Sequence, residues 1–115
     1  MVKEYYLLYG AQNVTIDEFG QLIGRDLGMK IELRSSSYLG EYVKCFGPQA
    51  DHLTVQPNEV AGEIIEEKFS EYPVLIYVSN TKGKNVDKEQ RTIKIKEIFQ
   101  SLPQPVLLKE TTTVN

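Results

Sequence analysis

Three residues that lie close together in the sequence are of the types that could form a thiol-based catalytic site. Cys45 could act as a nucleophile, His52 as its base and Asp51 as the residue that orients the imidazole. However, Cys45 alternates with Val43 in a strand-like pattern, and no helix N-terminus that would lower the thiol pKa is predicted beside it. We therefore expect Cys45 to be a small core residue, and we predict no catalytic residues.

The sequence also predicts no metal or phosphate site. His52 is the only histidine, and no Cys-x-x-Cys, His-x-x-x-His or acidic calcium-loop spacing occurs. Gly20, Gly24 and Gly28 recur every four residues, but they fall in a predicted helix. There they are expected to allow close packing rather than to cradle a phosphate. We expect no metal and no cofactor.

Charge is distributed unevenly along the second half of the chain. Residues 51–72 contain six carboxylates and one lysine, a net charge of −5, whereas residues 82–96 contain six cations and two carboxylates, a net charge of +4. One interpretation is two solvated surfaces. The other is that the acidic segment attracts a basic protein partner, because such fields raise association rates and select partners. The candidate partner-binding carboxylates are Glu59, Glu63, Glu66, Glu67 and Glu71.

The overall composition is typical of one globular domain spanning residues 1–115. Hydrophobic residues make up 41% and charged residues 25% of the chain, and the net charge is −3. No apolar run approaches the roughly 20 residues of a membrane-spanning helix, and the N-terminus has no signal-peptide core. We therefore expect a cytoplasmic protein that does not bind membranes. Its mild acidity argues against direct binding of nucleic acid.

Hydrophobic periodicity and turn residues predict the elements that would position these side chains. A strand over residues 3–9 is followed by a helix that begins after Thr15, whose spacing to Glu18 forms a capping box, and ends at Gly28. The apolar stripe of this helix consists of Ile16, Phe19, Leu22, Ile23 and Leu27. Three strands are then predicted, at residues 29–34, 42–46 and 52–56.

The second half of the chain contains a weakly patterned stretch before two clear elements. Residues 59–72 have sparse apolar periodicity, so we expect them to be mostly irregular with one helical turn. Val74–Ser79 predicts a central strand, and a second helix is predicted to begin with Asp87 as its cap and to end at Pro103. The last elements are a strand at residues 106–109 and a polar tail at 111–115.

This order of elements, β-α-β-β-β-β-α-β, predicts the fold class. It favours an α+β domain in which two helices pack on one face of a single antiparallel or mixed sheet of about six strands.

Three segments in the middle half of the chain resemble one group of small bacterial proteins. Residues 32–42 read ELRSSSYLGEY, which resembles an Arg-x-Ser-x-Tyr-x-Gly-x-Tyr signature. Residues 53–58 read LTVQPN and residues 69–78 read FSEYPVLIYV, with an acidic stretch between them. In these respects the chain resembles an immunity protein of a contact-dependent growth inhibition or related polymorphic-toxin system.

The resemblance implies a protein without catalytic activity that binds and neutralises a cognate toxin domain, often a nuclease, by occluding its active site. Tyr38 and Tyr42 of the signature join the five glutamates as candidate partner-binding residues. The alternative is a small enzyme or ligand-binding domain that uses Cys45 and His52 together with Tyr38 and Tyr42. The identity of the toxin and the oligomeric state are not indicated by the sequence.

Overall fold

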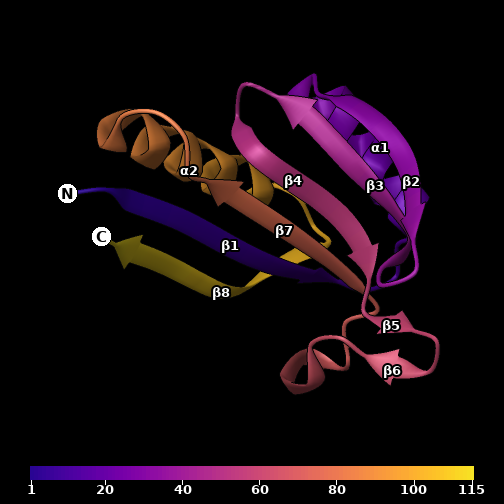
Figure 1. The fold of residues 1–115 in the computed structure, drawn as a ribbon. Helices are drawn as coiled ribbons and strands as arrows, with labels where there is room; N and C mark the ends of the chain where they lie inside the picture. Colours follow the sequence, from indigo (N-terminus) through magenta and orange to yellow (C-terminus); the bar gives the residue numbers. More distant parts are fainter.

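The protein, described by a computed structural model over residues 1–115, is built on one six-stranded antiparallel sheet (Figure 1). The strand order across the sheet is β2-β3-β4-β7-β1-β8. These strands are β1 (Lys3–Ala11), β2 (Lys30–Ser36), β3 (Gly40–Gly47), β4 (Ala50–Pro57), β7 (Val74–Asn80) and β8 (Pro105–Val114). The predicted fold class is therefore confirmed, and the sheet is antiparallel rather than mixed.

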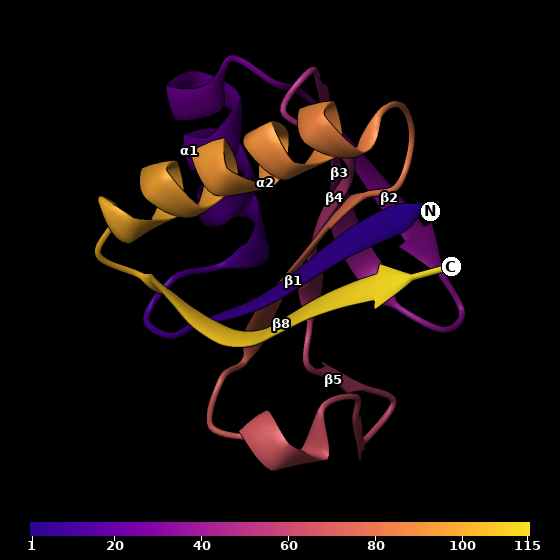
Figure 2. The same ribbon diagram turned by 90° about the vertical axis from the view of Figure 1, so that its left-hand side faces the viewer.

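Both helices, α1 (Ile16–Leu27) and α2 (Asn85–Gln100), lie on the same face of this sheet (Figure 2). Strands β2, β3, β4 and β7 follow one another as antiparallel neighbours, with short turns between β2, β3 and β4 and a longer connection from β4 to β7. The helices instead connect strands that are not neighbours, because α1 leads from β1 to the edge strand β2 and α2 leads from β7 across β1 to β8. The opposite face of the sheet carries no helix, and we call it the open face.

Helix α1 has the boundaries that its capping residues predict. The Thr15 hydroxyl accepts from the Glu18 amide at 3.0 Å, and the Glu18 carboxylate accepts from the Thr15 amide at 2.9 Å. Gly28 ends the helix in the left-handed conformation, with φ of 65°. Gly20 faces β3 so closely that a Cβ atom there would lie 2.9 Å from Val43 Cγ1, which confirms its close-packing role.

We expect Thr15→Ala to lower the free energy of unfolding by about 1 kcal/mol, because the Glu18 amide loses the hydroxyl that accepts its hydrogen bond. Urea unfolding followed by circular dichroism measures this change. Gln21→Ala, at an exposed position on the same helix, is the matched control and should leave the midpoint unchanged. Equal midpoints for Thr15→Ala and the parent protein would show that the capping box contributes nothing to stability.

The predicted start of the second helix is wrong. Helix α2 begins at Asn85, with Lys84 in the cap position and no side-chain cap, so Asp87 lies within the first turn. The reason is a tertiary contact: Asn85 Oδ1 accepts from the Lys3 amide at 3.0 Å, and Asn85 Nδ2 donates to the Met1 carbonyl at 2.8 Å. Asn85 thereby joins the helix to the start of β1, and the chain enters the helix two residues before Asp87.

The C-terminal residues form a strand where a polar tail was predicted. Strand β8 continues to Val114 and pairs with β1 from Lys3 to Ala11. The β-branched threonines at 111–113 favour extended backbone, and β1 supplies the ladder partners that the isolated sequence does not show. Val2 and Asn115 exchange both backbone hydrogen bonds, so the two termini lie side by side (Figure 2).

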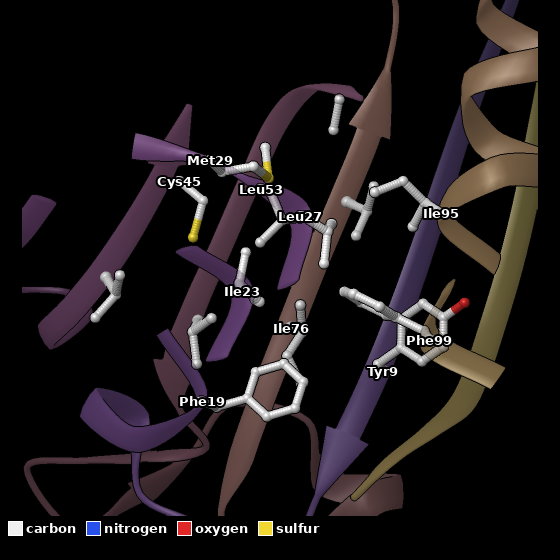
Figure 3. Packing of buried hydrophobic residues seen from close by; sticks show 14 of the residues in the cluster. Tyr9, Phe19, Ile23, Leu27, Met29, Cys45, Leu53, Ile76, Ile95 and Phe99 are labelled. Carbon is white, nitrogen blue, oxygen red and sulfur yellow. The ribbon is translucent and has the colours of Figure 1, made fainter. Parts of the chain in front are cut away.

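The core lies between the helices and the sheet (Figure 3). The Phe19 ring of α1 and the Tyr9 ring of β1 both pack edge to face on Phe99 of α2, with ring centroids 6.1 Å and 4.7 Å away, and Ile23 of α1 belongs to the same buried cluster. Burial of these rings and of the aliphatic residues around them is the main stabilising contribution to the domain. None of the helices combines the length and apolar character needed to cross a bilayer.

The connection between β4 and β7, residues 58–73, projects beyond the ends of these strands and away from both helices (Figure 1). We call it the acidic loop, because it holds five glutamates and one lysine. It contains a two-stranded ribbon and one helical turn: β5 (Glu59–Val60), β6 (Glu63–Ile64) and the 3₁₀ helix Glu67–Phe69. The helical turn confirms the prediction, whereas the ribbon was not predicted. Ala61 and Gly62 turn this ribbon with positive φ at both positions.

Candidate functional site

The structure does not assemble Cys45, Asp51 and His52 into a catalytic group. Cys45 of β3 pairs with Leu53 of β4 and faces the helices, where it is 2% exposed. His52 is the neighbour of Leu53 along β4 and therefore points to the open face. The thiol and the imidazole consequently lie on opposite sides of the sheet.

Asp51, at the start of β4, has a structural role. Its Oδ2 atom accepts from the amides of Thr81 and Lys82, both at 2.7 Å, and from Arg91 Nη2 at 3.3 Å. Burial raises the pKa of this carboxyl, but the two amides and Arg91 outweigh that effect and hold the pKa below its ordinary value. Asp51 therefore fixes the turn between β7 and α2 rather than orienting a catalytic histidine.

We expect the Cys45 thiol to be unreactive in the folded protein. Burial raises its pKa to about 12, so the thiolate fraction at pH 8 should be roughly 10³-fold lower than in the unfolded chain. Labelling with a chromogenic disulfide reagent, in buffer and in urea, measures the two rates. A native rate within tenfold of the unfolded rate would show that the thiol is accessible and ionised.

Tyr38 and Tyr42 also do not form a joint site with Cys45 and His52. Tyr38 lies between β2 and β3, and its side chain is 86% exposed. Tyr42 is half-buried on β3, where its register partner on β2 is Arg34. The four residues of the alternative enzyme hypothesis therefore do not converge on one cavity.

One buried asparagine organises the acidic loop. Asn58 is 1% exposed, and its Nδ2 atom donates to the carbonyls of Phe69 at 3.0 Å and Tyr72 at 2.9 Å. Its Oδ1 atom accepts from the Glu66 amide at 2.8 Å. The Asn58 backbone bonds to Pro73 and Ile65 as well, so a single residue connects the two ends and the centre of the loop.

Further contacts attach the acidic loop to the sheet. A Cβ atom at Gly10 of β1 would lie 2.6 Å from Tyr72 Cγ, so only a glycine leaves room for this ring against the open face. The Gln12 side chain donates to the Glu71 carbonyl at 2.7 Å. Together with Asn58, these contacts hold the loop against the end of the sheet.

The carboxylates of the acidic loop fall into two groups. Glu59, Glu63, Glu67 and Glu71 are exposed, and none of them forms an ion pair within the protein. Glu66 is half-buried and points back to the sheet, where its Oε2 atom accepts from the Tyr77 hydroxyl at 2.5 Å. Burial, this bond and the Glu66 charge all raise the pKa of Tyr77. The predicted set of five glutamates thus contains four free carboxylates and one attached to the sheet.

The basic stretch at residues 82–96 is largely used within the fold. Lys88 is buried, Arg91 pairs with Asp51, and Lys96 pairs with Glu110 at 2.9 Å. The exposed cations without an ion pair in this stretch are Lys82, Lys84 and Lys94. The free charge of the molecule is therefore more concentrated on the acidic loop than on α2.

The open face carries a hollow of about 590 Å³ next to the acidic loop. Its polar and aromatic lining comes mainly from Tyr6, His52, Glu66, Tyr77, Ser79 and Lys109. Of these, the sequence predicted only Glu66 as a partner-binding residue. Period-two alternation in β1, β4 and β7 shows which residues share a face, but it does not show which strands are neighbours.

No three or more His, Cys, Asp or Glu side chains gather in an arrangement that could hold a metal ion. A scan against protein-family models finds no match to this chain, and a search of curated proteins finds none either. The functional proposal therefore depends on the α+β fold, the acidic loop and the hollow beside it.

Proposed function

We propose that this chain is an immunity protein that binds a cognate bacterial toxin domain and neutralises it by occluding its active site. The observation that carries the proposal is the acidic loop, which presents four exposed carboxylates without internal ion pairs on a backbone held in place by Asn58. The motifs resembling immunity proteins support it from the sequence: the signature includes Tyr38 and Tyr42, and one of the later segments ends at Asn58.

The physical basis of the proposal is charge complementarity combined with preorganisation. A nuclease active site is basic because it must bind phosphates, and a row of carboxylates can occupy such a site in place of nucleic acid. Because the loop is already ordered, little conformational entropy is lost when the toxin binds. Such a mechanism requires no cofactor and no catalytic residue from this chain.

The test uses the protein domain encoded beside the gene for this chain. We expect that domain to inhibit bacterial growth when expressed alone, and co-expression of this chain to restore growth. The purified proteins should form a stoichiometric complex by calorimetry, with a Kd in the nanomolar range or below. Absence of both growth rescue and complex formation would contradict the proposal.

A further inference from the structure

The hollow on the open face owes its shape to small residues between large ones. One row across the sheet runs from His52 through Ser79 and Tyr6 to Thr111, as the strand registers place these residues opposite one another. The side chain of Ser79 cannot fill the space between the imidazole and the tyrosine ring. The adjacent row consists of Thr54, Tyr77, Leu8 and Lys109. Its aromatic member, Tyr77, stands beside the gap left by Ser79.

Glu66 places a carboxylate in this hollow from the acidic loop. Its Oε2 atom is bound by the Tyr77 hydroxyl, whereas its Oε1 atom has no hydrogen bond or ion pair within the protein. Glu66 is held at two points. The Tyr77 hydroxyl donates to its carboxylate, and its backbone amide donates to Asn58 Oδ1. A fixed carboxylate with one unused oxygen is suited to a cationic hydrogen-bond donor.

The other walls of the hollow favour a planar cation. Tyr6, Tyr77 and His52 contribute aromatic rings to the lining, and a guanidinium can stack on such rings while it donates to a carboxylate in its own plane. An ammonium group is more strongly hydrated and cannot stack in this way. Lys109, on the β8 side, limits the cation to the half of the hollow nearest Glu66, because like charges repel.

We propose that the hollow is an arginine-binding site, in which a guanidinium of the toxin lies between the Tyr6 and Tyr77 rings and binds the free Oε1 atom of Glu66. The inference deepens the proposed function, on which it rests for the identity of the partner. It assigns a different task to Glu66 from that of the four exposed glutamates, which contact the toxin beyond the hollow. The site would give the complex a fixed orientation as well as charge attraction.

The first test needs no toxin. N-acetyl-arginine amide is titrated into the isotope-labelled protein, with N-acetyl-citrulline amide as the uncharged control of the same shape. We expect saturable amide shifts at Ser79, Thr54 and Glu66 with the arginine probe, at millimolar Kd, and at least tenfold weaker binding of citrulline. Glu66→Gln retains an oxygen for the Tyr77 hydroxyl and should also weaken arginine binding at least tenfold. Equal affinities for the two probes, or for the parent and Glu66→Gln, would overturn the proposal.

The second test uses the toxin domain. Ser79→Leu fills the hollow without changing a charge, and we expect it to weaken toxin binding at least tenfold while the protein remains folded by circular dichroism. If Ser79→Leu unfolds the protein, Glu66→Gln supplies the same comparison. If the parent protein and these variants bind the toxin with equal affinity, the arginine site is refuted but the proposed function is not. Parent protein that does not bind the toxin, yet binds the arginine probe, would refute the proposed function instead.

Discussion

Asn58→Ala is expected to lower the free energy of unfolding by about 2–4 kcal/mol and to release the acidic loop from its conformation. The substitution removes three side-chain hydrogen bonds at a residue that is 1% exposed. It leaves the Tyr72 carbonyl and the Glu66 amide without partners, whereas the Phe69 carbonyl still accepts from the Tyr72 amide. Each unsatisfied buried group costs roughly 1–3 kcal/mol, and partial hydration of the released loop reduces the total. Urea unfolding measures the free energy of unfolding, and hydrogen exchange of the backbone amides in residues 58–73 measures how readily the loop opens.

The matched comparison is Gln12→Ala, which removes one exposed hydrogen bond to the Glu71 carbonyl. Its effect should be below about 1 kcal/mol. Asn58→Asp should be nearly as damaging as Asn58→Ala, because a carboxylate cannot donate to the two carbonyls. Similar stability for the Asn58 and Gln12 variants would mean that the loop is held by its own local turns, and preorganisation would then no longer support the proposed function.

Replacing Glu59, Glu63, Glu67 and Glu71 together with glutamine is expected to weaken toxin binding by about ten- to hundredfold. Each exposed carboxylate that meets a cation contributes a fraction of 1 kcal/mol, and the four add up because they are held on one ordered loop. Most of the loss should appear in the association rate. Added salt should slow association of the parent protein and have less effect on the variant. Surface-immobilised binding kinetics at low and physiological salt measure both effects.

The control variant replaces the exposed cations Lys82, Lys84 and Lys94 with glutamine. It changes charge just before and within α2 rather than on the acidic loop, and a basic toxin should bind it as well as, or slightly better than, the parent protein. Identical rates for the parent and the four-glutamine variant at both salt concentrations would remove the exposed glutamates from the interface. The hairpin that carries Tyr38 and Tyr42 would then become the next candidate surface.

Local signals in the sequence were sufficient to predict most of the secondary structure and the fold class. Thr15, Glu18 and Gly28 define the ends of α1 because capping is a short-range interaction among residues within one or two turns. The apolar alternation in β3 and β4 predicts their buried faces for the same reason, since side-chain direction repeats every two residues. The start of α2 and the length of β8 could not be predicted in this way, because Asn85 and the threonines at 111–113 find their partners in β1.

The charge of the candidate site could be predicted from the sequence, but the spatial arrangement of its residues could not. The sequence by itself determined that five glutamates fall in one connection, and it correctly made Cys45 a core residue. Only the tertiary structure separated Glu66 from the other four glutamates, turned His52 away from Cys45 and brought Tyr6 beside Ser79. These outcomes depend on which strands become neighbours and in what register. That choice is made by long-range packing of the whole sheet against two helices, so no short stretch of sequence contains it.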